Sequence, residues 1–250
     1  MRILFLGDIV GKKALEVICN NIQTLKKENN INLVLANAEN VEGGKGLSKT
    51  SYIALQKAGI SGLTMGNHTY SKKNIFEFIN EANIARPANM PLAPGKDFLT
   101  IKYNDKTLTL ISVLGRVFMN MSLDCPFKTL DNLLPKLKSD YIILDVHAEA
   151  TSEKLALAYY FKDRVDVVLG THTHVQTADE RLIGKTLYIT DVGMCGPLDS
   201  IIGDDIEAIT SRFITGVYTP AKVAEGKTII NGVILDLDKR TIRRLNKIYE

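Results

Sequence analysis

Short apolar runs rich in β-branched residues recur along the chain, and most alternate with segments whose apolar residues are spaced three and four apart. The short runs predict buried strands, and the spaced segments predict amphipathic helices. This alternation is typical of an α/β protein with a largely parallel core sheet. We expect the first strand at 2–7 and the first helix at 12–28, where Leu15, Ile18 and Ile22 share one face.

The same patterns place the remaining elements. Strands are expected at 33–36, 62–65, 141–146, 165–169 and 186–190, and helices at 48–58, from Ser71 onward, at 126–138, from Thr151 onward and at 204–212. Two hairpins interrupt the alternation, one joining 98–103 to 106–113 and the other joining 227–236 to 241–249. Because the chain contains no internal repeat or linker, we expect one domain over residues 1–250.

Composition narrows the class of protein. Hydrophobic residues make up 45% of the 250 positions and charged residues 24%, which is ordinary for a globular chain. The 31 basic and 28 acidic side chains are too balanced to indicate a surface for polyanions. Three cysteines with no CxxC spacing favour a reducing, cytoplasmic setting. The apolar amino terminus breaks at Gly7 and Asp8, too early for a membrane span, so we expect no membrane contact.

Candidate chemistry gathers where five predicted strands end. The residues that follow these strands are Asp8, then Glu39 and Asn40, then Asn67 and His68, then His147, and finally His172 and His174. The carboxyl ends of strands in an open α/β sheet share one edge, so these side chains should meet there. All four histidines of the chain belong to this set. The sequence therefore predicts a metal or acid-base site.

The donor types indicate which metals would bind. Imidazole and oxygen donors without a thiolate suit iron, manganese or catalytic zinc. Eight candidate groups are too many for one ion. A single carboxylate can bridge two cations about 3.5–4 Å apart, which generates a nucleophilic hydroxide for attack on a phosphoryl centre. Glu39 is the natural bridge.

These motifs resemble those of the calcineurin-like metallophosphoesterases. The blocks stand here as G-D-I-V at 7–10, N-A-E-N at 37–40, G-N-H at 66–68, D-V-H at 145–147 and G-T-H-T-H at 170–174. Val10 occupies the position of the family's first histidine, and Glu39 that of its bridging aspartate. Together with T-D-V-G-M-C-G-P-L-D-S, these departures resemble the branch of YmdB-type bacterial phosphodiesterases. Tyr70 and Ser71 stand where that branch has Trp-Asp.

The resemblance implies a four-layer α/β/β/α sandwich of two mixed sheets and a dinuclear centre, with iron as the implied metal. It implies metal-dependent hydrolysis of a cyclic nucleotide, with 2′,3′-cyclic AMP as the associated substrate. One metal would be held by Asp8, Glu39, Asn40 and His174, and the other by Glu39, Asn67, His147 and His172. His68 would remain free to orient the phosphate or to protonate the departing ribose oxygen. A homo-oligomer is compatible with this interpretation.

Several segments keep two interpretations. The glycine-rich stretch 42–46 could be a phosphate loop, but it lacks the Walker spacing and suits a rim of the metal site. The loop 193–203 could close over substrate or simply connect a strand to a helix. Asp145 and Glu149 could hydrogen-bond metal ligands, or Glu149 could favour the first turn of a helix. Cys195 lacks a dedicated base for nucleophilic chemistry.

Other functions also stay open. The basic residues at 239–247 could contact RNA, but the sequence favours a charged, solvated edge strand that resists aggregation. A nucleotide-sensing or RNA-associated regulator would bind ligand without turnover. A diiron oxidoreductase would place carboxylates on bundle helices rather than at strand ends.

Overall fold

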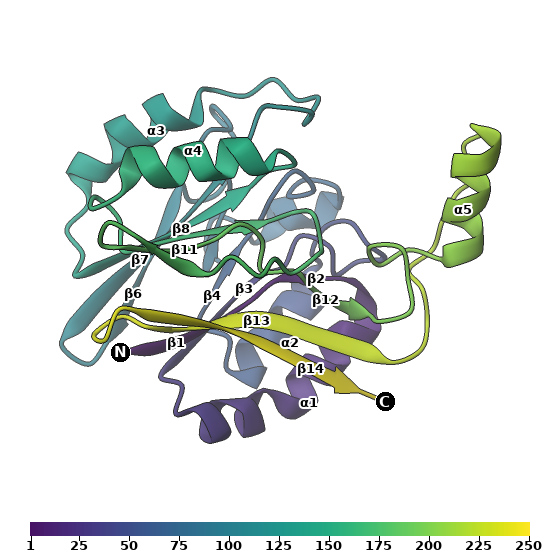
Figure 1. The fold of residues 1–250 in the computed structure, drawn as a ribbon, viewed down its shortest axis with the longest axis horizontal. Helices are drawn as coiled ribbons and strands as arrows, with labels where there is room; N and C mark the ends of the chain where they lie inside the picture. Colours follow the sequence, from purple (N-terminus) through teal and green to yellow (C-terminus); the bar gives the residue numbers. More distant parts are fainter.

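A computed structural model describes residues 1–250. Two mixed β-sheets face each other, and helices lie on their outer faces (Figure 1). Helices α1 (Gly11–Asn29) and α2 (Lys49–Ala58) cover one sheet, while α3 (Pro126–Leu133) and α4 (Thr151–Phe161) cover the other. The expected α/β fold of two mixed sheets in four layers is confirmed.

The first sheet draws on both ends of the chain. Its strands lie in the order β2 (Asp8–Ile9), β12 (Met194–Pro197), β13 (Thr228–Asp236), β1 (Arg2–Leu6), β3 (Leu33–Asn37), β4 (Gly62–Thr64) and β5 (Ile84–Ala85), with β14 (Thr241–Tyr249) also paired to β13. Strands β1, β3, β4 and β5 run parallel, and β13 runs antiparallel to β1. The terminal hairpin therefore completes the sheet that the first strand begins.

The second sheet is continuous in the middle of the chain. Its order is β10 (Arg181–Ile183), β11 (Thr186–Ile189), β9 (Val167–Thr171), β8 (Tyr141–His147), β7 (Lys106–Leu114) and β6 (Phe98–Tyr103). The four central strands are parallel, and the outer two close as antiparallel hairpins. The strands that sequence patterning predicts in both sheets fall within two residues of their expected bounds.

Three apolar clusters fill the spaces between layers. Alternation along β1 divides its side chains, because Ile3 and Phe5 face the second sheet while Leu4 and Leu6 face α1 and α2. A third cluster joins the second sheet to α3 and α4. Both sheets are thus covered on both faces, which explains their nearly continuous apolar sequence.

Three sequence expectations need correction. No α-helix begins at Ser71; a short 3-10 turn spans Lys73–Glu77, and Phe76 within it is 51% exposed. The Ser71 hydroxyl contacts His68 instead of capping a helix. The helix predicted at 126–138 ends at Leu133 and tightens into a 3-10 turn at Leu134–Lys136, because Pro135 cannot continue an α-helix.

The third correction concerns loop 193–203, which contains strand β12. This strand pairs in parallel with β2 and antiparallel with β13, so it lies inside the first sheet. Its sequence, Met-Cys-Gly-Pro, carries no period-two pattern and ends in proline. Burial on both faces and the short length hide it from sequence patterning.

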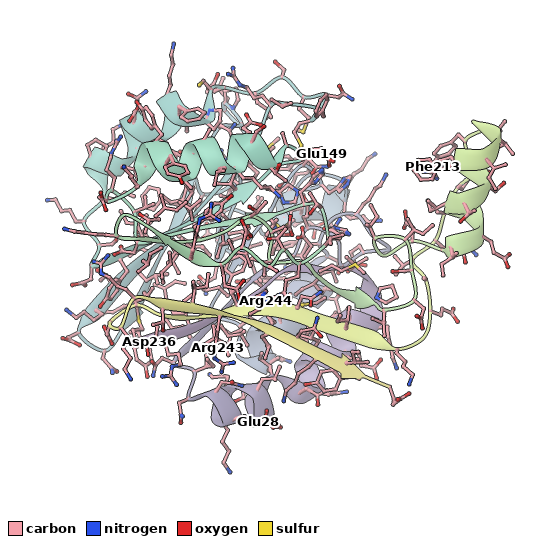
Figure 2. The ribbon with its side chains drawn as sticks, in the orientation of Figure 1. Glu28, Glu149, Phe213, Asp236, Arg243 and Arg244 are labelled. Atoms are coloured by element: carbon pink, nitrogen blue, oxygen red, sulfur yellow. The ribbon has the colours of Figure 1, made fainter.

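The basic terminal strand β14 lies at the edge of the first sheet, where its side chains have protein partners (Figure 2). Arg244 pairs with Glu180 at 2.9 Å and Lys247 with Glu28 at 2.5 Å, while Arg243 donates to Asn29. These contacts support the interpretation of a charged edge strand, which resists pairing with another sheet.

Helix α5 (Ile206–Thr215) stands away from the layered body (Figure 1). Asp205 caps it by accepting a hydrogen bond from the Ala208 amide, and Gly216 ends it in a left-handed conformation. None of the helices has the length and apolar composition that crossing a bilayer requires.

The apolar layer between the sheets should dominate stability. Phe5→Ala removes a fully buried ring and is expected to lower the free energy of unfolding by about 3–5 kcal/mol. The same substitution at Phe213, which is 82% exposed, should change it by no more than about 0.5 kcal/mol. Urea denaturation of both variants tests this, and equal effects would contradict the layered packing.

Candidate metal centre

The five strand-end clusters converge where the carboxyl ends of the two sheets meet. Asp8, Glu39 and Asn67 follow strands of the first sheet, whereas His147 and His172 come from β8 and β9 of the second. Contacts between residues more than a hundred positions apart, such as Glu39 with His147, join the two sets. The expectation that the clusters meet is confirmed.

His147 lies at the centre of the cluster. Its Nε2 atom is 2.9 Å from Asn67 Oδ1, 3.0 Å from Glu39 Oε1 and 3.1 Å from His172 Nδ1. Potential ligand atoms of Glu39, His147 and His172 all lie within 4.8 Å of one another. Four donor atoms directed at one small volume are the arrangement that a cation requires.

Asp8 connects this group to His174. Its Oδ1 atom lies 3.7 Å from His147 Nδ1 and 4.0 Å from His174 Nε2, and its Oδ2 atom accepts a hydrogen bond from the His172 amide. His174 Nδ1 donates to the Ile202 carbonyl at 2.6 Å, which leaves Nε2 free on the side of Asp8. His174 is thus oriented toward the same cluster.

Three buried oxygens in the cluster accept no hydrogen bond. They are Asp8 Oδ1, Glu39 Oε1 and Asn40 Oδ1. The Asn40 amide nitrogen donates to the Gly44 carbonyl. This bond fixes the orientation of the amide, whose oxygen then has no hydrogen-bond partner. A buried acceptor without a partner is destabilising, and a cation satisfies such an acceptor. The residues therefore fit a metal centre.

Electrostatics divides the cluster into charged and neutral groups. Burial raises the pKa of Glu39, but His147 outweighs burial and lowers that pKa to about 2. Burial lowers the pKa of His147, yet Glu39 and Asp8 raise it to about 9. Burial and the neighbouring His147 lower the pKa of His172 to about 3, so its ring is neutral with a free lone pair. Burial raises the pKa of Asp8, because the ionised carboxylate is costly away from water; a nearby positive charge lowers that cost.

A hydrogen-bonded chain holds the His147 ring from behind. Its Nδ1 atom is 2.8 Å from the Thr171 hydroxyl, and that hydroxyl donates to Asp145 Oδ1 at 2.7 Å. Thr64 donates to the other oxygen of Asp145 at 2.5 Å. Burial raises the pKa of Asp145 to about 6. Such a chain fixes which imidazole nitrogen faces a metal.

Glu149 supports the neighbouring ring. Its carboxylate lies 3.2 Å from His172 Nε2, so that nitrogen donates while Nδ1 faces His147. Figure 2 shows Glu149 beside the end of α4, in the loop between β8 and that helix. Asp145 and Glu149 thus both support histidines of the cluster, Asp145 through Thr171 and Glu149 directly.

The loop carrying His172 and His174 has an unusual backbone. Both residues have positive φ, 99° and 66°, which non-glycine residues rarely adopt. Between them, the Thr173 amide and hydroxyl donate to Asp191 Oδ2 at 3.1 and 2.8 Å. Lys154 of α4, fully buried, donates to the same oxygen at 2.7 Å. This ion pair holds the strained loop in place.

Sequence patterning did not predict this ion pair, although the sequence contains two signals of it. Asp191 follows β11 and so occupies a sixth strand end. Lys154 occupies a buried position of α4, in the same apolar period as Leu157 and Phe161, where a lysine needs a partner. Neither signal identifies the other residue without the fold.

Gly66 is required by close packing beneath the cluster. A Cβ atom at this position would lie 2.4 Å from the His147 ring and 2.5 Å from Glu39 Oε2. The glycine of the G-N-H block therefore makes room for two site residues.

A cavity of about 500 Å³ opens above the cluster. Site residues Glu39, Asn40, His68, His172 and His174 line one side, and Gly43, Lys45, Ile202, Arg212 and Tyr218 are among the others. The glycine-rich stretch at 42–46 is thus a rim of the site, and the end of loop 193–203 forms another wall. Cys195 lies outside this lining; burial raises the pKa of its thiol, which donates to Asn231.

His68 lines the cavity from β4. Its amide donates to Glu39 Oε2 at 2.8 Å, and its Nδ1 atom is 3.3 Å from the Ser71 hydroxyl. Burial lowers the pKa of this histidine. Ser71, one of the two departures from the family block, is therefore the residue that contacts the ring.

Breaking the buried ion pair should destabilise the protein. Lys154→Met leaves Asp191 buried without its cation and is expected to lower the free energy of unfolding by about 3–5 kcal/mol. Adding Asp191→Asn should recover part of that loss. Lys162→Met, on the exposed surface beyond α4, is the control in urea denaturation. A Lys154 variant as stable as the Lys162 variant would contradict this role.

Comparisons with known proteins agree with this site. The sequence matches the family of YmdB-like proteins over residues 4–248. It is 47% identical over 246 residues to a 2′,3′-cyclic-nucleotide 2′-phosphodiesterase of Bacillus subtilis, covering 96% of this chain and 93% of the relative. The crystal structure of a hypothetical protein from Thermus thermophilus superposes with a TM-score of 0.93 at 40% identity, covering 100% and 99% of the two chains.

More distant structures share the fold alone. The NAD nucleotidase of Haemophilus influenzae is 14% identical, with a TM-score of 0.54 over 100% of this chain and 55% of the nucleotidase. One assignment follows from the motifs, from the two mixed sheets and from the match along nearly the whole sequence: this chain belongs to the YmdB-like family.

Proposed function

We propose that this protein is a metal-dependent phosphodiesterase that hydrolyses cyclic nucleotides, with 2′,3′-cyclic AMP as its substrate. The observation that carries the proposal is the convergence of imidazole, carboxylate and amide side chains, three of them with unsatisfied oxygens, beside one cavity. The name of the Bacillus subtilis relative supplies the substrate class. In the proposed reaction water is consumed, the 2′ P–O bond breaks, and a 3′-phosphate and a 2′-hydroxyl remain.

Two metal ions fit the donor set. Asp8, Glu39, Asn40 and His174 would hold one, and Glu39, Asn67, His147 and His172 would hold the other. The absence of a thiolate suits iron, and manganese or zinc are alternatives. When bound, the ions supply Lewis-acid charge beside the phosphoryl oxygens.

His68 is the cavity residue proposed to contact the phosphate. Its Nδ1 atom faces Ser71, so the ring can accept a hydrogen bond there and donate from Nε2. A donor preset toward the cavity stabilises the negative charge that develops on a phosphoryl oxygen. Residues 43–45 and Ile202 line the same cavity beside His68.

Metal content tests the proposed ligands independently of activity. Elemental analysis of the purified protein is expected to find two ions per chain. Glu39→Gln, which alters the shared carboxylate, should lower that content and remove the rise in Tm that metal produces. Glu180→Gln makes the same change away from the cluster and should leave the content at two. Full metal content in the Glu39 variant would contradict the ligand assignment.

Turnover of 2′,3′-cyclic AMP tests the activity itself. His68→Gln is expected to reduce kcat by about 10²–10³-fold with metal content unchanged, because one charge-stabilising donor is lost. Ser71→Ala should produce a smaller fall in kcat, because it removes only the contact that orients the His68 ring. Saturable binding of the nucleotide without turnover by the metal-loaded wild type would favour the sensor alternative instead.

A further inference from the structure

Residues 204–221, named here the α5 arm, form an extension fastened mainly at its base. Asp204 bridges to both Ile201 and Val223, and the Asp205 amide donates to the Lys222 carbonyl at 2.9 Å. These contacts join the two ends of the arm, while α5 itself projects from the layered body (Figure 1). The extension does not belong to either sheet. Its role is therefore sought in the side chains that it places beside the cavity.

Four residues of the α5 arm line the cavity above the metal cluster: Asp204 and Ala221 near its base, and Arg212 and Tyr218 farther along it. The Arg212 guanidinium lies 4.7 Å from the centre of the Tyr218 ring, and its Nη2 atom donates to the Thr219 carbonyl at 2.5 Å. This is a cation–π contact. Arg212 forms no ion pair with a carboxylate, and its buried Nε atom has no hydrogen-bond partner. Its partners are thus the tyrosine ring and the Thr219 carbonyl, both within the arm.

Tyr218 is 74% exposed although it lines a cavity. Because the guanidinium covers one face of the ring, the opposite face is available to a ligand. A positioned, exposed aromatic ring beside a phosphoryl site offers a stacking surface for a nucleobase, since every base has a flat π-face. The metal cluster and His68 offer nothing comparable for a base, because their contacts are polar.

We propose that the α5 arm is the nucleobase-recognition element of this protein, with Tyr218 stacking on the base and Arg212 positioning the tyrosine ring. This inference rests on the proposed function, since it assumes a nucleotide whose phosphate lies at the metal cluster. Stacking tolerates different bases, so the arm selects for the presence of a base more than for its identity.

The test compares 2′,3′-cyclic AMP with a base-free analogue, the methyl riboside 2′,3′-cyclic phosphate. Tyr218→Ala is expected to raise the ratio of KM for cyclic AMP to KM for the analogue about tenfold, the size of one lost stacking contact. Tyr218→Phe keeps the ring and should restore the wild-type ratio. Arg212→Lys keeps the charge but loses the planar contact, and should raise KM for cyclic AMP with kcat retained.

Phe213→Ala provides the matched control. Phe213 lies on the same helix and is 82% exposed, but it does not line the cavity (Figure 2). Its removal should leave both KM values unchanged. An unchanged ratio in Tyr218→Ala, or an equal change in Phe213→Ala, would overturn the inference while the phosphodiesterase assignment stands.

Calorimetric binding of 2′,3′-cyclic AMP to the metal-loaded protein separates the two proposals. If the wild type binds but does not turn over, the proposed activity fails, and the arm is then tested by affinity alone. In that case Tyr218→Ala should weaken binding about tenfold, whereas Tyr218→Phe should not. Equal affinity of the Tyr218→Ala variant and the wild type would overturn the role of the arm.

Discussion

Burial of negative charge between two sheets is the constraint on which the site depends. Asp8, Glu39, Asp145 and Asp191 are almost wholly inaccessible to water. Moving carboxylates out of water is strongly unfavourable unless positive charge or several hydrogen bonds accompany them.

Each carboxylate meets this constraint differently. Asp191 has Lys154, and Asp145 is held by threonine hydroxyls. Glu39 and Asp8 share the imidazole of His147, with His174 also near Asp8, and each carboxylate retains an oxygen without a hydrogen bond. The uncompensated negative charge is therefore concentrated at one point, where a bound cation would compensate it. The need to compensate this charge explains why the donors lie at strand ends. There, both sheets can contribute side chains without losing hydrogen bonds between their strands.

The sequence predicted this convergence because strand ends are marked by local pattern. An apolar run followed by Asp, Glu or His identifies the edge, and parallel topology brings such edges together. Local pattern could not reveal β12, whose four residues are defined only by the strands on either side. It also could not pair Lys154 with Asp191 or place Tyr218 beside the cavity, because these contacts follow from tertiary placement. The helix wrongly predicted from Ser71 also reflects tertiary placement, because the Ser71 hydroxyl contacts His68 instead of capping a helix.

The pairing of β1 has a consequence for how the protein is made. Asp8 lies two residues after β1, yet β1 lies between β3 and β13, and β2 pairs with β12. The sheet that carries Asp8 cannot close until β12 and β13, which begin at Met194 and Thr228, have been synthesised. Until then the nascent chain presents the unpaired edge of β1 and its apolar faces, the features that make long-range β topologies slow to fold and prone to association. The candidate metal site is thus among the last parts of the molecule to form, and the unfinished chain must avoid association until then.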